Sequence, residues 1–372
     1  MTIVYDARFA TARPTGIGRV CGEVLRGLAG LPDRPPLAVL VNRETALPEG
    51  VRSAAGIRCI DAPWNPHGLA NQRRLPRLLR EIGATLYHGM DVFTPVAAPG
   101  VKTVVTVHDL IPLLFARHLP HSRKARVRPL WRLWLKLQAA RAAVVVAVSR
   151  RTAADAARVL HIPRRKIRVV CNPVPETGPA GDPGALRRRL GLTGRLLVCV
   201  GRQDPYKNVA GLVRALPRIQ ESCDGPVRLV IAGPPDPRHP EARREVERLG
   251  LGNAVSFTGW LDDADLGALY RAGDCFVFPS LYEGFGLPPL EAMRHGLPVV
   301  ASDRASIPEV LGDAALYADP EDPGALAKAV LRILHDPALV RRLREAGRRR
   351  AAEFTAERSA REYLDVYREA LG

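Results

Sequence analysis

Short apolar runs alternate with longer stretches of helical periodicity along the whole chain of 372 residues. The runs are rich in Val, Leu and Ile, which is typical of strands buried on both faces of a parallel sheet. The stretches between them repeat apolar residues at the spacing of helices that cover a sheet. Predicted strands cover residues 2–6, 37–41, 57–61, 85–88, 101–107, 143–148, 167–170, 196–200, 229–232, 255–257, 275–278, 299–301 and 315–317. Strand–helix alternation in both halves predicts an α/β fold with two parallel domains.

Prolines and glycines crowd residues 173–185, which we interpret as a linker between the domains. The first domain then covers residues 1–172 and the second covers residues 186–355, and both are of ordinary domain size. The terminal residues 354–371 have helical periodicity.

Residues 275–310 contain the densest set of signals in the chain. A buried strand, 275–278, leads into a glycine loop, 283–286, and Pro288 then opens a helix. This loop lies at the carboxyl end of its strand, where open α/β sheets bind ligands. Helix N-terminal amides beside glycines favour a diphosphate. Because Glu283 and Glu291 would repel phosphate, we expect them to face hydroxyl groups, and the combination suits a nucleotide sugar.

The sequence EGFGLPPLE, with GLPVV and SIPEV after it, resembles the E-x7-E signature of retaining GT-B glycosyltransferases of family 4. The resemblance implies a GT-B fold, two facing Rossmann-like domains with an inter-domain cleft. Residues 356–372 would form a helix that packs back on the first domain. Glu283 would contact hydroxyls of the donor sugar and Glu291 the ribose. The diphosphate would be held by the amides of Gly284, Phe285, Gly286 and Leu287.

Arg202 and Lys207 follow a predicted buried strand and precede a helix. Two cations at that place suit a leaving diphosphate, which gains charge as the glycosidic bond breaks. On their spacing in the sequence alone, we would interpret Arg202 and Lys207 as two surface cations that bind no phosphate. The pattern G-R-x4-K-N matches the phosphate-binding pair of the family, so the resemblance assigns both residues to the diphosphate.

The first half contributes two further candidates. Thr15-Gly-Ile-Gly-Arg19 follows the first strand, and the resemblance implies that this loop, with Gly16 and Gly18, closes over the donor diphosphate. His108 follows the strand 101–107, and it is either a packed histidine or an acid–base group near the reaction centre. The resemblance favours the second role, and Asp109 would orient the loop.

Three acids, Asp262, Asp263 and Asp265, stand where a helix begins, so we interpret them as capping residues rather than metal ligands. We expect no metal and no cofactor other than the nucleotide sugar as co-substrate. The six cysteines are scattered without metal-ligand spacing, which favours a reduced, cytoplasmic setting. We also expect no signal peptide and no membrane span.

The net charge of +17 comes from the first half of the chain. Residues 1–180 hold 28 Lys and Arg against 11 Asp and Glu, whereas the remainder holds 27 of each. The imbalance indicates an anionic partner, such as a membrane surface, a lipid-diphosphate acceptor or nucleic acid.

Residues 117–141 are the most basic stretch and have two interpretations. They form either an interfacial helix that lies on anionic lipid, or an ordinary helix with a solvated basic face. In the second case Leu130, Leu133, Trp134 and Leu137 would pack on the sheet.

The sequence therefore predicts a retaining hexosyltransferase that uses a nucleotide diphosphate sugar and acts in the synthesis of cell-surface glycans. GDP-mannose is the favoured donor, with UDP- and dTDP-sugars open, and the acceptor would be a saccharide or a lipid-linked sugar. Two alternatives remain: a nucleotide-sugar epimerase of the same fold, and a non-catalytic binder of anionic lipid or polymer. A dehydrogenase lacks support because no G-x-G-x-x-G fingerprint is present. We expect no nucleic-acid partner, and a cytoplasmic enzyme that is peripheral on the inner face of the membrane.

Overall fold

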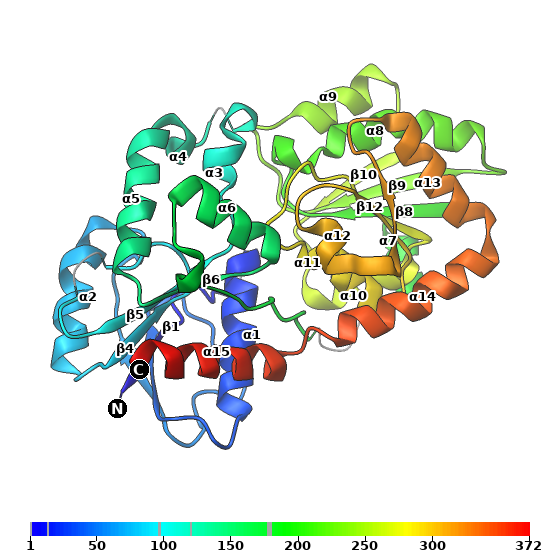
Figure 1. Ribbon diagram of the computed structural model, residues 1–372. Coiled ribbons are helices and arrows are strands. Elements are labelled where there is room, and N and C mark those ends of the chain that lie inside the picture. The colour runs from blue at the N-terminus through cyan, green and yellow to red at the C-terminus, as the bar shows by residue number, and fades with distance from the viewer. Residues whose placement is uncertain (1, 13–14, 96–97, 120, 177–180) are drawn as a thin grey trace. The chain divides into compact units, whose positions relative to one another are not determined.

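The computed structural model describes residues 2–12, 15–95, 98–119, 121–176 and 181–372. The chain forms two compact units (Figure 1). Unit 1 contains Met1–Leu113, Val127–Pro175 and Phe354–Gly372. Unit 2 contains Glu176–Glu353 together with the short segment Leu114–Arg126. Residues 177–180 of the predicted linker lie outside the described residues.

Unit 1 is built on a parallel sheet of seven strands in the order β3-β2-β1-β4-β5-β6-β7. The central strand β1 pairs with β2 on one side and with β4 on the other, so Ile3 lies opposite both Leu37 and Leu86. The strands are β1 (Ile3–Asp6), β2 (Leu37–Val41), β3 (Ile57–Asp61), β4 (Leu86–Gly89), β5 (Lys102–Val107), β6 (Val144–Ala147) and β7 (Ile167–Val169).

The helices of unit 1 are α1 (Gly16–Gly30), α2 (Leu69–Glu81), α5 (Arg128–Arg141), α6 (Arg150–Leu160) and α15 (Ala356–Leu371), with the short helix α3 (Ile111–Leu114) at its boundary and a 3-10 turn at Arg164–Lys166. The C-terminal helix α15 lies beside α1 (Figure 1). Gly27 permits this approach, because a Cβ there would come within 2.2 Å of the Ala356 carbonyl oxygen.

Unit 2 contains a parallel sheet of six strands in the order β10-β9-β8-β11-β12-β13. The strands are β8 (Arg195–Val200), β9 (Val227–Ala232), β10 (Val255–Gly259), β11 (Cys275–Phe278), β12 (Val299–Ser302) and β13 (Ala315–Ala318). The helices are α4 (Arg123–Arg126), α7 (Pro183–Arg189), α8 (Val209–Glu221), α9 (Glu241–Arg248), α10 (Asp263–Ala272), α11 (Leu287–Arg294), α12 (Ile307–Leu311), α13 (Pro323–His335) and α14 (Pro337–Ala352), with 3-10 turns at Ala116–His118, Pro205–Lys207 and Gly312–Ala314.

The prediction of an α/β fold with two parallel sheets is confirmed, and every predicted strand is present within a few residues of its expected bounds. Ser149 caps α6, because its hydroxyl accepts the Thr152 amide at 3.0 Å. Helix α7 begins at Pro183, inside the stretch interpreted as a linker, and Asp182 caps it. No helix within the described residues is both long enough and apolar enough to cross a lipid bilayer.

The interpretation of residues 117–141 as one sheet-packed helix is wrong. The segment forms a 3-10 turn, Ala116–His118, and two helices, α4 and α5, and Pro120 lies outside the described residues. Leu130, Leu133 and Leu137 are exposed, whereas Leu135, Gln138 and Ala139 are buried. Periodicity identified the apolar side of this helix, but the fold turns a different side toward the sheet.

Candidate active site

The strand order of unit 2 creates a crevice between β8 and β11. The chain runs outward from β8 through β9 and β10, then returns to place β11 on the other side of β8. Loops that follow neighbouring strands on the two sides of such a reversal diverge and leave room for a ligand at the carboxyl edge. Arg202 and Lys207 follow β8, and Glu283 follows β11. The fold thus brings two predicted site segments to one crevice.

Lys207 and Glu283 form an ion pair in this crevice. Lys207 Nζ lies 2.6 Å from Glu283 Oε1, and the two side chains are 17% and 9% exposed. The 3-10 turn that carries Lys207 is tied to the loop after β11, because the Leu281 amide donates to the Tyr206 carbonyl at 2.7 Å. The pair therefore joins the two loops, and both of its side chains retain only a small exposed fraction.

The loop after Glu283 is shaped by one serine and one glycine. Ser306 Oγ lies 2.9 Å from the carbonyl oxygen of Glu283 and 3.2 Å from that of Phe285. Gly286 has φ 99°, a left-handed conformation that favours glycine. It starts α11, and among the described side chains none caps this end of the helix. The N-terminus of α11 therefore offers the Leu287 amide and the helix dipole to an anion, since Pro288 and Pro289 have no N–H.

Glu291 lies on α11 and is 5% exposed. Tyr270 donates its hydroxyl proton to Glu291 Oε2 at 2.9 Å, and the Tyr270 ring stacks on His295 with the ring centroids 5.6 Å apart. The tyrosine therefore orients the carboxylate of Glu291.

Arg202 is 54% exposed and faces acids other than Glu283. Its Nε lies 3.1 Å from Asp204 Oδ2, and its Nη2 lies 3.8 Å from Asp236 Oδ2. Arg238 bonds both carboxylate oxygens of Asp236 and thereby holds the pKa of that carboxyl well below its usual range. Arg202 thus stands beside the crevice with Asp204 as its main partner.

Asp204, Asp236 and His239 bring one potential metal-ligand atom each within 4.8 Å of the others. Both acids already pair with arginines, so we interpret the group as an ion-pair cluster. The absence of a required metal stays a prediction. Of the other acids considered from the sequence, Asp262 caps α10, because its Oδ1 accepts the Asp265 amide at 2.8 Å, and Asp263 and Asp265 lie in the first turn of that helix.

The predicted residues of unit 1 lie at the carboxyl ends of its strands. His108 follows β5, and its Nε2 donates to the Met90 carbonyl at 2.8 Å, which leaves Nδ1 as the acceptor nitrogen of the neutral ring. Burial lowers the pKa of His108, which favours that neutral ring. Asp109 accepts the Ile111 amide at 2.9 Å and so orients the loop.

Gly16 and Gly18 open α1, and the Gly18 amide donates to the hydroxyl of Thr15 at 3.4 Å. The two glycines therefore stand at a helix N-terminus, as the sequence predicts for a phosphate-binding loop, while residues 13–14 lie outside the described residues.

The sequence did not reveal a buried charge network at the end of β1. Arg8 Nη2 lies 2.6 Å from Asp6 Oδ2, and both side chains are at most 1% exposed. Tyr87 on β4 donates to the same Asp6 oxygen at 2.7 Å, and Asn71 Oδ1 accepts from Arg8 at 3.1 Å. The sequence does show two opposite charges, Asp6 and Arg8, at the end of the first strand. Their partners Tyr87 and Asn71 come from distant segments, so the sequence alone does not reveal the network.

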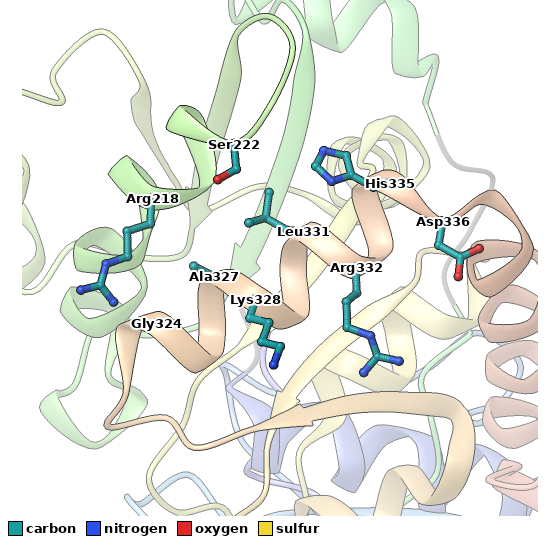
Figure 2. Close-up of a pocket in the computed structure, with 9 residues that line it drawn as sticks. All are labelled: Arg218, Ser222, Gly324, Ala327, Lys328, Leu331, Arg332, His335 and Asp336. Carbon is teal, nitrogen blue, oxygen red and sulfur yellow. The ribbon is translucent and has the colours of Figure 1, made fainter.

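A separate cavity of about 540 Å³ lies between α8 and α13 (Figure 2). Its lining contains none of the predicted site residues. Figure 2 shows Lys328 and Arg332 pointing to one side of α13, and Ala327 and Leu331 to the other. Because the cations do not converge, we do not assign an anion to this cavity.

Comparisons with known proteins identify the family of the chain. Residues 14–177 match the model for Glycosyltransferase Family 4, and residues 186–350 match that for Glycosyl transferases group 1. The chain is 30% identical to O-antigen chain mannosyltransferase B of Escherichia coli over 81% of this chain and 78% of that protein. It is also 30% identical to the serotype-specific mannosyltransferase WbdA of Escherichia coli, over 76% of this chain but only 36% of that longer protein.

The fold resembles that of sucrose-phosphate synthase of Thermosynechococcus elongatus, a GT-B glycosyltransferase, with a TM-score of 0.74. Sequence identity is 22%, and the match covers 99% of this chain and 98% of that one. The chain therefore belongs to the GT-B glycosyltransferases of family 4, the glycosyl transferases of group 1.

Proposed function

We propose that the protein is a retaining glycosyltransferase that moves a hexose from a nucleotide diphosphate sugar to a saccharide or lipid-linked acceptor. One observation carries the proposal: the Lys207–Glu283 pair stands in the crevice between β8 and β11, beside the uncapped N-terminus of α11. That arrangement offers a cation and amides for a diphosphate and a carboxylate for sugar hydroxyls.

Donor binding would exchange the ion pair for ligand contacts. Lys207 and Arg202 would turn to the diphosphate, which is also held by the amides of Gly284, Phe285, Gly286 and Leu287. Glu283 would then accept hydrogen bonds from hydroxyls of the sugar, and Glu291 from the ribose. Since a carboxylate and an ammonium 2.6 Å apart neutralise each other, their mutual contact avoids two unpaired charges.

The reaction would break the bond between the anomeric carbon and the diphosphate oxygen. The acceptor oxygen attacks from the same face, its proton passes to the departing phosphate, and the anomeric configuration is retained. Lys207, Arg202 and the amides stabilise the charge that grows on the diphosphate. His108 would lie near the donor sugar, where its neutral ring can accept a hydrogen bond from a hydroxyl. Neither a metal nor another cofactor is needed for these steps.

GDP-mannose is the proposed donor, because two relatives are named as mannosyltransferases. The name of the first relative also includes an O-antigen chain, and the basic first half suits an anionic or lipid-linked acceptor in glycan synthesis. The enzyme would then work in the cytoplasm, peripheral on the inner face of the membrane.

A thermal-shift panel of GDP-, UDP- and dTDP-sugars, run on the wild type and Lys207→Ala, tests the donor site. A ligand that binds the folded state raises Tm with the logarithm of its concentration over Kd. We expect GDP-mannose to raise the Tm of the wild type and not that of Lys207→Ala. A Tm rise with a UDP- or dTDP-sugar instead would identify that sugar nucleotide as the donor. Equal Tm rises in the wild type and in Lys207→Ala would show that Lys207 does not contact the donor.

The stereochemistry and the reaction class need a second measurement. Incubation of the donor with a mannose-terminated oligosaccharide, followed by NMR of the product, should show the anomeric configuration of the donor. Inversion would contradict the proposed mechanism. Conversion of the donor sugar without any acceptor would instead establish an epimerase.

A further inference from the structure

Arg202 is held by a carboxylate that is itself buried. Two nitrogens of Arg202 contact Asp204: Nε lies 3.1 Å from Oδ2, and Nη2 donates to Oδ1 at 3.3 Å. The Asp204 side chain is 8% exposed, whereas that of Arg202 is 54% exposed. An ion pair between two exposed side chains orders little, because both of them can move. Here the fold fixes the acid, and the two contacts fix the plane of the guanidinium.

The same acid also starts the turn that carries Lys207. The Lys207 amide donates to the Asp204 carbonyl at 2.9 Å and so closes the 3-10 turn Pro205–Lys207. The carboxylate of Asp204 does not cap this turn, so it stays available to Arg202. The backbone of Asp204 therefore sets the position of Lys207, and its side chain sets that of Arg202. One residue thus relates both cations of the loop after β8.

The neighbouring charged groups do not compete for this contact. His239 is buried, and its Nε2 lies 4.0 Å from Asp204 Oδ1, beyond hydrogen-bond distance. Asp236 Oδ2 lies 3.8 Å from Arg202 Nη2, but both oxygens of Asp236 already accept from Arg238, at 2.8 and 2.6 Å. Arg202 and Asp204 are therefore the closest charged partners of each other among the described residues.

The contact leaves one edge of Arg202 for an anion. A guanidinium carries five N–H donors, and Asp204 contacts the edge formed by Nε and Nη2. Nη1 makes no hydrogen bond and no ion pair with any residue that the structure describes. Its two N–H groups can bind phosphate oxygens while the other edge keeps Asp204, because the planar guanidinium presents both edges at once.

We propose that Asp204 is a positioning residue, which stays bonded to Arg202 when the donor binds and holds Nη1 toward the diphosphate. A carboxylate beside a phosphate site reduces its attraction for the anion, so donor affinity does not explain this acid. Orientation does, because a cation that is placed in advance stabilises the charge that grows on the leaving diphosphate. The inference rests on the proposed function, since it requires the diphosphate to bind at Arg202.

Asp204→Asn tests the inference, because it keeps the size of the side chain and removes its charge and one of its two carboxylate oxygens. Calorimetric titrations with GDP, UDP and dTDP identify the nucleotide that binds. Its Kd should be no higher in Asp204→Asn than in the wild type, because a charge that repels the phosphates is absent. The kcat for transfer to a mannose-terminated oligosaccharide should fall at least about tenfold, because Arg202 is no longer held in place.

Asp236→Asn is the matched control. It removes a second negative charge near Arg202 but leaves both contacts of Asp204, so it should keep the kcat of the wild type. Both asparagine variants should keep the Tm of the wild type. A lower Tm together with weaker nucleotide binding in Asp204→Asn would identify Asp204 as a residue that only supports the fold, and would overturn the inference.

A double-variant comparison tests whether Asp204 acts through Arg202. Arg202→Ala should lower kcat by itself, and the addition of Asp204→Asn should lower it no further, because the group that Asp204 positions is already absent. Independent losses that multiply in the double variant would overturn the inference, as would wild-type kcat in Asp204→Asn. Both results leave the Lys207–Glu283 site in place. A wild type that binds none of the three nucleotides would instead refute the proposed function, and this inference with it.

Discussion

The two sheets each reverse their strand order once, and each reversal carries a charged pair of a different kind. In unit 1, β1 and β4 flank the reversal, and Asp6 pairs with Arg8. In unit 2, β8 and β11 flank it, and Lys207 pairs with Glu283. Both pairs have a closest N–O distance of 2.6 Å, so distance alone does not distinguish them.

Burial and the number of partners do distinguish the pairs. Asp6 and Arg8 are sealed from water and share further hydrogen bonds with Tyr87 and Asn71. Both charges are paired and hydrogen-bonded within unit 1, so we interpret the pair as one that stabilises this unit. Lys207 and Glu283 retain some exposure and stand beside an uncapped helix N-terminus. A ligand that brings an anion to Lys207 and hydroxyls to Glu283 can replace this bond without leaving either charge unpaired, which is what a substrate site requires.

The largest predicted effect concerns the buried pair. Arg8→Met should lower the free energy of unfolding by about 3–5 kcal/mol, because it leaves Asp6 charged and unpaired in the core. Urea unfolding followed by circular dichroism measures this loss. The double variant Arg8→Met, Asp6→Asn should recover part of it. A loss below about 1 kcal/mol in the free energy of unfolding would show that the Asp6–Arg8 pair does not stabilise unit 1.

The Lys207–Glu283 pair should behave in the opposite way. Lys207→Ala and Glu283→Ala should each reduce the rate of sugar transfer by about 10²–10³-fold, since each removes a group that faces the developing charge or the sugar. Their Tm values should stay within a few degrees of the wild type. Arg189→Ala removes another ion pair of unit 2, that with Asp265, and should leave transfer unchanged. Transfer near the wild-type rate in either site variant defeats the assignment.

Acid should also weaken the interior of unit 1. Burial and then the charge of His108 lower the pKa of His88 from 6.5 to about 3. The unfolded chain takes up a proton below about pH 6.5 and the folded chain does not, so stability falls as pH drops toward 3, by up to about 1.4 kcal/mol per pH unit. His88→Gln should flatten this slope between pH 7 and 5 in urea unfolding. The exposed His121 provides the control, because His121→Gln should keep the slope.

The smallest predicted effect is a difference in stability between alanine variants of the two glycine loops, at Gly286 and at Gly16. Gly286→Ala should cost about 1–2 kcal/mol, because its φ of 99° is strained for any residue with a Cβ. Gly16→Ala should cost nothing measurable, since no atom lies within 4 Å of the added Cβ and Gly16 does not have a positive φ. Equal stability losses in the two variants, measured by urea unfolding, would contradict this difference between the loops.

The local features of the fold were predictable because they depend on neighbouring residues. Apolar runs bury themselves as strands wherever they occur, so the strands were found near their observed bounds. Asp262 was recognised as a cap because a side-chain oxygen three residues before an amide is a local arrangement. The same holds for the glycine loop at 283–286, which turn chemistry places directly after β11.

The sequence by itself thus determined the strands, the caps and the loops that carry the candidate residues. Only the tertiary structure decided which of these residues meet, because partners depend on the order of strands in the sheet. Lys207 and Glu283 are 76 positions apart, and Tyr270 and Glu291 are 21 apart. The orientation of α5 was decided in the same way. Helical periodicity defines an apolar side, but the contacts of Gln138 and Arg132 with other elements determine that this side faces outward.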